Sequence, residues 1–250
     1  MGRINLYIHY DTVSNYIMTR GIDLQKEDFE LEEVPSNLIL AEAPTNFGRF
    51  DVPTNFKILR GKDEVVRYMK YVNEEQLRMS NWIDFETIEM MHELTPEEIA
   101  ELLYLFHSSM SLRSAFFYKL QNNYVYLTLP NGLNKVYYRH VSHFFPRFAR
   151  VMTEQMYESI NSNRSMLFQR RTPVTSFPIE YAEGLLPLFQ NGIKIGFTQP
   201  LVTNDIWTLP LFIIEDDLTL LSRQQPQNEQ IGTISYDLKK QTWQLNLAQD

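Results

Sequence analysis

Two Asn-rich turns in the middle of the chain constrain the fold more than any other feature. Asn122-Asn123 and Asn131-Gly132 each separate runs of strand-forming residues, and both dipeptides favour two-residue hairpin turns. With two-residue turns, both hairpins predict the same parity, in which Lys119 faces Tyr126 and Tyr126 faces Tyr137. A shift of one residue would mix the two faces of the sheet. The spacing therefore predicts an aromatic three-stranded antiparallel meander with one apolar face and one polar-aromatic face.

Helical patterns lie on both sides of this meander. The apolar spacing from Val65 to Val72 predicts a first helix, and Asp84 is the expected cap of a short second one. A third helix begins at Thr95-Pro96-Glu97-Glu98, which combines an N-cap, a proline at the first helical position and a capping-box glutamate. After the meander, the apolar stripe predicts a further helix over about 143–160.

The last third of the chain changes to a strand pattern. Strands are expected after Gly192, one of them at Leu218–Ser222, and the last two form a hairpin that pairs Tyr236 with Trp243. The fold class predicted is α+β: helices packed around the meander, with a second antiparallel β group in the C-terminal third. We expect residues 1–165 to form a helical and meander region and residues 166–250 a C-terminal α/β-hairpin region, although the weak boundary also allows one domain.

A short repeat stands near the N-terminus. Pro44-Thr45-Asn46-Phe47 recurs as Pro53-Thr54-Asn55-Phe56. Proline fixes one backbone angle and asparagine tolerates turn geometry, so each copy predicts a turn with its phenylalanine as a hydrophobic plug. The usual role of such residues favours the interpretation that the two turns hold an arm against the core. The alternative is a repeated ligand-binding loop.

The charge of the chain is uneven. The formal net charge is −8, yet no aspartate or glutamate occurs between Leu102 and Thr153. A positive block inside an acidic protein indicates either an anion-binding surface or a docking face for the protein's own acidic parts.

The polar-aromatic face of the meander is expected to carry three basic residues of this segment, Lys119, Lys135 and Arg139. Lysine and arginine attract phosphates, and tyrosine rings can stack on bases. The same side chains also suit an intramolecular contact, a dimer contact or an ordinary solvated face. The candidate contact residues for a ligand or partner are Lys119, Tyr124, Tyr126, Lys135, Tyr137 and Arg139.

Several function classes lack their sequence signals. The chain has no cysteine, no glycine-rich phosphate loop, no nucleophile motif and no apolar run of the roughly 20 residues that a membrane helix needs. We expect a cytoplasmic protein with no metal, cofactor or membrane contact. His140 and His143, with His107, are the best metal candidates, but no acidic residue lies near them in sequence, and His140 continues the core parity of Val136 and should be buried.

Three functions are compatible with these patterns. The leading hypothesis is a non-catalytic interaction or regulatory protein. A protein partner or a second copy would bind the polar-aromatic face of the meander, which we call the basic-aromatic face. The second is a binder of single-stranded nucleic acid or another polyanion on the same face. The third is an enzyme acting on a small anionic substrate near His140, His143 and Arg139.

Overall fold

The computed structural model describes residues 4–23, 34–41, 46–75, 80–107, 115–129, 132–162, 171–214 and 229–248. The chain packs as two compact units. The first unit is Met1–Tyr10, Met18–Ile22 and Phe144–Asp250, and the second unit is Asp11–Ile17 and Asp23–His143. Both units combine helices with antiparallel strands, so the α+β class is confirmed. Compact packing does not show which segments fold independently, so the boundary near residue 165 stays a prediction.

The second unit is built on an antiparallel sheet in the order β8-β7-β6-β3-β5-β4. Its interior is aromatic, because Trp82 of β6 stacks on Tyr126 of β7 with ring centroids 5.6 Å apart. The strands are β3 (Asn37–Leu40), β4 (Arg49–Phe50), β5 (Lys57–Arg60), β6 (Trp82–Phe85), β7 (Tyr124–Thr128) and β8 (Asn134–Tyr138).

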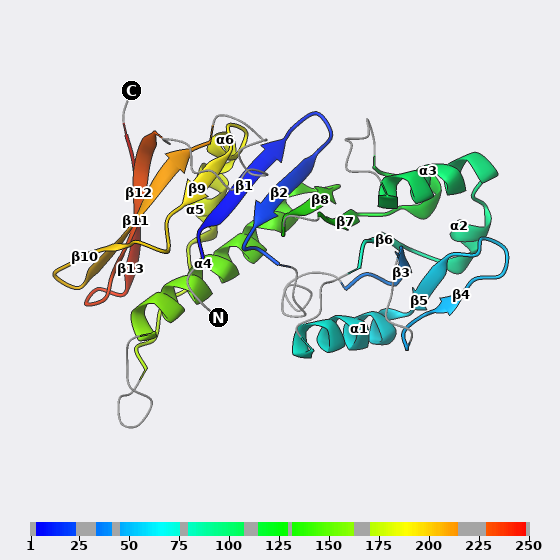
Figure 1. The fold of residues 1–250 in the computed structure, drawn as a ribbon, viewed down its shortest axis with the longest axis horizontal. Coiled ribbons are helices and arrows are strands. Elements are labelled where there is room, and N and C mark those ends of the chain that lie inside the picture. Colours follow the sequence, from blue (N-terminus) through cyan, green and yellow to red (C-terminus); the bar gives the residue numbers. More distant parts are fainter. Residues whose placement is uncertain are drawn as a thin grey trace. The chain divides into compact units, whose positions relative to one another are not determined.

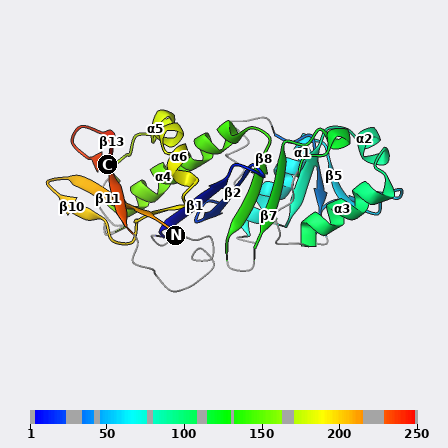
Figure 2. The ribbon, with the colours of Figure 1, turned by 90° about the horizontal axis from the view of Figure 1, so that it is seen from above.

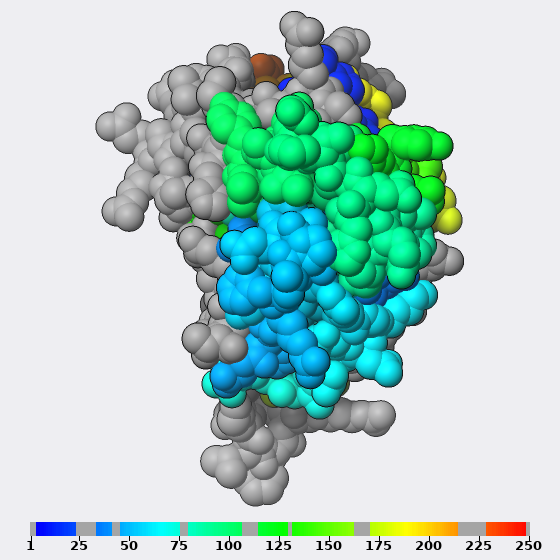
Figure 3. Space-filling view, turned by 90° about the vertical axis from the view of Figure 1, so that its right-hand side faces the viewer, coloured from blue at the N-terminus to red at the C-terminus, as the bar shows by residue number. Residues whose placement is uncertain are grey.

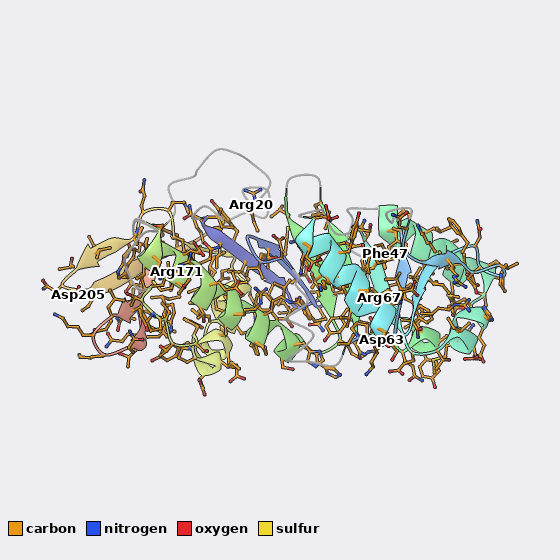
Figure 4. All side chains as sticks on the ribbon, turned by 90° about the horizontal axis from the view of Figure 1, so that it is seen from below. Arg20, Phe47, Asp63, Arg67, Arg171 and Asp205 are labelled. Carbon is orange, nitrogen blue, oxygen red and sulfur yellow. The ribbon has the colours of Figure 1, made fainter. Side chains whose placement is uncertain are left out.

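Three helices accompany this sheet: α1 (Lys62–Glu74), α2 (Ile88–His92) and α3 (Pro96–His107). Figures 1 and 4 show α1 on one face of the strands and α2 with α3 on the other. The predicted capping box of α3 is present: the Thr95 N–H donates to Glu98 Oε2 at 2.7 Å, and the Glu98 N–H donates to Thr95 Oγ1 at 3.3 Å.

The predicted cap of α2 is wrong. Asp84 lies inside β6, and the side chain of Thr87 caps α2 by accepting from the N–H of Met90. The segment Trp82–Phe85 pairs with its neighbours as a buried strand, and the helix begins only after Thr87.

The strands of the first unit follow the order β13-β12-β11-β9-β1-β2, with β10 paired to β11. The hairpin of the last two strands has the predicted register, with Tyr236 opposite Trp243 and Ile234 opposite Leu245. The expected strand at Leu218–Ser222 lies outside the described residues. The strands are β1 (Leu6–Asp11), β2 (Tyr16–Arg20), β9 (Ile193–Ile195), β10 (Leu201–Thr203), β11 (Ile206–Ile213), β12 (Gln230–Asp237) and β13 (Thr242–Leu247).

The helices of the first unit are α4 (Phe144–Asn161), α5 (Ile179–Gly184) and α6 (Leu186–Phe189), which gather on one side of the unit in Figure 2. Aromatic edge-to-face contacts join them to the sheet, since Phe177 contacts Phe148 at 5.6 Å and Trp243 at 5.1 Å between ring centroids. Among the described helices of both units, none is long and apolar enough to cross a bilayer.

The register predicted for the meander is wrong by one residue. Tyr126 pairs with Val136, and Tyr137 pairs with Val125. The N–H of Leu129 donates to the carbonyl of Leu133 at 2.8 Å, so three residues separate this pair, and Gly132 has φ +71°. A three-residue hairpin loop with glycine in the left-handed region replaces the expected two-residue turn and shifts the pairing.

The first of the two predicted hairpins is absent. Tyr118–Leu120 forms a 3-10 helix, and Gln121 ends it with φ +49°. The third strand of the aromatic group is β6 instead, which pairs with β7 in an antiparallel manner.

Candidate functional site

Of the six residues predicted to contact a partner, four lie in β7 and β8 and are divided between the two faces of the sheet, whereas Lys119 lies in a 3-10 helix and Arg139 follows the end of β8. Directly opposed residues share a face, so Tyr124 and Tyr126 lie on one side, while Lys135 and Tyr137 lie on the other. All four are buried, with exposed fractions of 5%, 2%, 2% and 0% in the order Tyr124, Tyr126, Lys135 and Tyr137. In the second unit these side chains are therefore part of the core.

The three basic residues of this set have partners inside the second unit. Lys135 lies over the ring of Tyr16, with its Nζ 4.1 Å from the centroid. Lys119 Nζ pairs with Glu98 Oε2 at 2.8 Å, and Arg139 Nε donates to the carbonyl of Asn122 at 2.8 Å. The contact of Lys119 with α3 corresponds to the alternative in which the acid-free segment docks against the protein's own acidic helices.

The prediction that His140 is buried is wrong. Strand β8 ends at Tyr138, and a bend precedes a 3-10 helix at Val141–His143, so the alternation of the strand stops before His140 and leaves it exposed. His143 is held by its neighbour, because its Nδ1 lies 2.6 Å from the Tyr124 hydroxyl. Within the described ranges, no three histidine, aspartate or glutamate side chains are grouped closely enough to hold a metal ion.

Asp84 is a buried carboxylate that the sequence patterns missed. Both of its oxygens accept the N–H of Asn123 at 3.0 Å, and Oδ1 also accepts the N–H of Tyr124 at 2.7 Å. Burial raises the pKa of Asp84 to about 7, although these hydrogen bonds and the charge of Arg139 oppose the shift. Asp84 thus joins β6 to the start of β7.

A second site stands at the start of α1. A pocket of about 470 Å³ opens where strands β4 and β5 meet this helix. Four of its side chains are cationic and two are acidic, which leaves a positive lining in an acidic chain. Figure 4 marks Asp63 and Arg67 on α1, and Figure 3 shows the surface at the β4 and β5 end. The lining residues are Arg49, Ile58, Arg60, Gly61, Lys62, Asp63, Glu64 and Arg67.

Two side-chain acceptors fix the backbone around the pocket. Gly61 has φ +85°, a conformation that favours glycine, and its N–H donates to Asn37 Oδ1 at 3.1 Å. Glu64 Oε2 accepts the N–H of Arg60 at 2.8 Å, so this carboxylate is already engaged. The first N–H groups of a helix have no intrahelical acceptor and carry partial positive charge, which adds to the cations of the pocket.

Arg60 connects the pocket to a buried carboxylate. Its Nη2 lies 3.3 Å from Asp51 Oδ1, and the side chain of Asp51 is only 2% exposed. His92 Nε2 of α2 lies 2.9 Å from the same Oδ1. Thr54 donates to Oδ2 through its N–H at 3.2 Å and its hydroxyl at 2.8 Å. Burial disfavours the charged form of Asp51, but the bonds from His92 and Thr54 outweigh it and lower the pKa of this carboxyl below 3.8.

These contacts also explain the second Pro-Thr-Asn-Phe segment. Asp51 and Phe56 close the turn through backbone bonds, Asn55 has φ +59°, and Phe56 is buried. In the first copy, Phe47 packs against Tyr68 and Tyr71 of α1, as expected for a plug, while residues 44 and 45 lie outside the described residues. The second copy thus supplies the turn that holds Asp51, and Phe47 of the first copy packs on α1.

The pocket had no clear signal in the sequence. Its arginines are separated by many residues and stand in the most acidic part of the chain. They meet because β4 pairs with β5, which places Arg49 opposite Ile58, and because α1 follows β5 after one glycine. The one local signal was the succession of a strand, a glycine and a helix, an arrangement that often binds anions at the helix N-terminus.

None of the protein-family models, curated proteins or solved structures compared with this chain matches it.

Proposed function

We propose that this is a non-catalytic interaction or regulatory protein that binds an oxyanion in the pocket at the start of α1. The observation that carries the proposal is the lining itself, with Arg49, Arg60, Lys62 and Arg67 around about 470 Å³. Arginine presents forked N–H donors that match phosphate and sulfate oxygens. A volume of this size suits a small ligand or an anionic group carried by a larger one.

The basic-aromatic face gives less support as a contact surface, because most of its side chains are in the core of the second unit. In this proposal the pocket, and not the basic-aromatic face, is the contact surface for the ligand or partner. A protein partner, a second copy of the chain and a cytoplasmic location stay predictions, and each is compatible with recognition of an anionic group.

The enzyme alternative near His140, His143 and Arg139 has weaker support. Arg139 Nε is bonded to the carbonyl of Asn122, and His143 Nδ1 to the hydroxyl of Tyr124. These bonds account for both groups as parts of the framework, so we favour binding over catalysis.

Sulfate binding at low ionic strength tests the proposal. We expect isothermal titration to detect sulfate, and Arg49→Gln with Arg67→Gln to weaken the affinity by about tenfold or more, since charge-assisted hydrogen bonds are lost. The matched control is Lys239→Gln with Lys240→Gln, which removes the same charge from exposed positions in the first unit. Absence of binding, or equal losses in both pairs of variants, would contradict the proposal.

A further inference from the structure

The oxygen Oδ1 of Asp51 is shared by two cationic groups of different kinds. Arg60 reaches it at 3.3 Å and His92 at 2.9 Å. Arginine stays charged at every physiological pH, whereas histidine gains and loses its proton between about pH 5 and 8. The charge partners of Asp51 therefore depend on whether His92 carries a proton, while the lowered pKa of Asp51 keeps this carboxylate ionised.

Arg60 belongs to both sites. It lines the pocket and pairs with Asp51, and its side chain is 52% exposed. While His92 is neutral, Arg60 is the charged group paired with Asp51 Oδ1, and this pairing reduces the charge that Arg60 offers to an anion in the pocket. When His92 is protonated, the imidazolium compensates Asp51 instead.

Three charged groups around His92 can be named among the described residues. Glu89, on the same helix α2, interacts with His92 electrostatically. An imidazolium at His92 carries the charge opposite to that of Asp51 and the same charge as Arg60. The side chain of His92 is 38% exposed, so protons reach it from solvent without a conformational change.

We propose that His92 regulates the anion affinity of the pocket: its protonation frees the charge of Arg60 from Asp51, so anions bind more tightly at mildly acidic pH. This inference rests on the proposed oxyanion site. Protonation of His92 strengthens anion binding whether Arg60 turns toward the anion or remains in place, because the positive charge on His92 offsets the charge of Asp51 in both cases. By linkage, an anion bound in the pocket must also raise the proton affinity of His92.

Sulfate is a suitable probe, because it does not titrate in this range and the pH dependence then belongs to the protein. We expect titration calorimetry to give an affinity roughly three- to tenfold tighter at about pH 5.5 than at about pH 8. Binding at intermediate pH should take up protons, which is measured by repeating the titration in buffers of different ionisation enthalpy.

Two variants separate the regulation from general charge effects. His92→Gln keeps an N–H donor for Asp51 but cannot be protonated. The sulfate affinity of this variant should therefore lose the three- to tenfold difference between about pH 5.5 and about pH 8. His140→Gln removes an exposed histidine far from the pocket in the sequence and should retain the wild-type dependence. If sulfate binds equally at both pH values, or binds without proton uptake, the regulation is wrong and the oxyanion site stands. If sulfate binds at neither pH, both are wrong.

Discussion

Asp84 and Lys135 place ionisable groups inside the second unit, and each is stabilised in a different way. Asp84 accepts backbone N–H groups at the junction of β6 and β7, and Lys135 lies on the face of Tyr16. A buried charge without such partners would cost several kcal/mol. Both residues are therefore structural anchors, and the raised pKa of Asp84 links its protonation to folding.

The pH dependence of stability should reveal Asp84. Its folded pKa of about 7 lies above its ordinary value of 3.8, so the folded state binds this proton more tightly. Between these two values the free energy of unfolding falls as pH rises, with a contribution of at most about 1.4 kcal/mol per pH unit. Asp84→Asn keeps an acceptor for the two N–H groups and should remove this contribution. Urea unfolding of both proteins across the window measures it, and an unchanged slope in the variant would contradict the assignment.

The sequence did not predict the surroundings of individual side chains. Lys135 and Tyr137 were expected on a contact surface, because lysine and tyrosine in a strand read equally well as a solvated or a ligand-binding face. Burial of lysine depends on the aromatic rings that cover its amine and its stem, and Tyr16 comes from a segment far away in the sequence. Single-sequence patterns do not contain such long-range contacts.

Local signals decided the elements that were predicted well. Helix α3 begins where its capping box stands, and the β12–β13 hairpin has the expected pairs, since both depend on residues close together in the chain. The meander was wrong where one residue of loop length decided the outcome. Asn131-Gly132 permits a two-residue or a three-residue loop, and only pairing with the rest of the sheet selects between them.

The capping box of α3 gives a prediction at this scale. Thr95→Ala removes the acceptor for the N–H of Glu98 and should lower the free energy of unfolding by about 1 kcal/mol. Glu97→Gln, in the same turn but outside the box, is the matched control and should change it much less. Chemical denaturation of the three proteins provides the comparison, and equal effects of the two substitutions would argue against the cap.

The whole molecule carries a formal net charge of −8, while the pocket at α1 is positive. Acidic surfaces repel long polyanions, and a single positive pocket attracts a local anionic group. The two anion-binding hypotheses therefore differ in the length of ligand that they favour.

Oligothymidylates of increasing length distinguish them. A single pocket predicts that affinity stays nearly constant once one phosphate fits, with a shallow dependence on salt. A polyanion-binding surface predicts affinity that rises with length and falls steeply as salt is added. Fluorescence anisotropy at two salt concentrations makes the measurement, and a steep, length-dependent response would favour the nucleic-acid alternative over the oxyanion pocket.

The pairing of β1 with β9 has a consequence for the time at which the first unit can fold. Leu6 is opposite Ile195, so the N-terminal strand leaves the ribosome long before its partner is made. At roughly 5–20 residues per second, this delay lasts on the order of ten seconds or more. Most of the second unit is contiguous and emerges within that interval. Protease protection of stalled nascent chains should therefore appear in Asp23–His143 first, while the edge of β1 that pairs with β9 stays open until β9 is made.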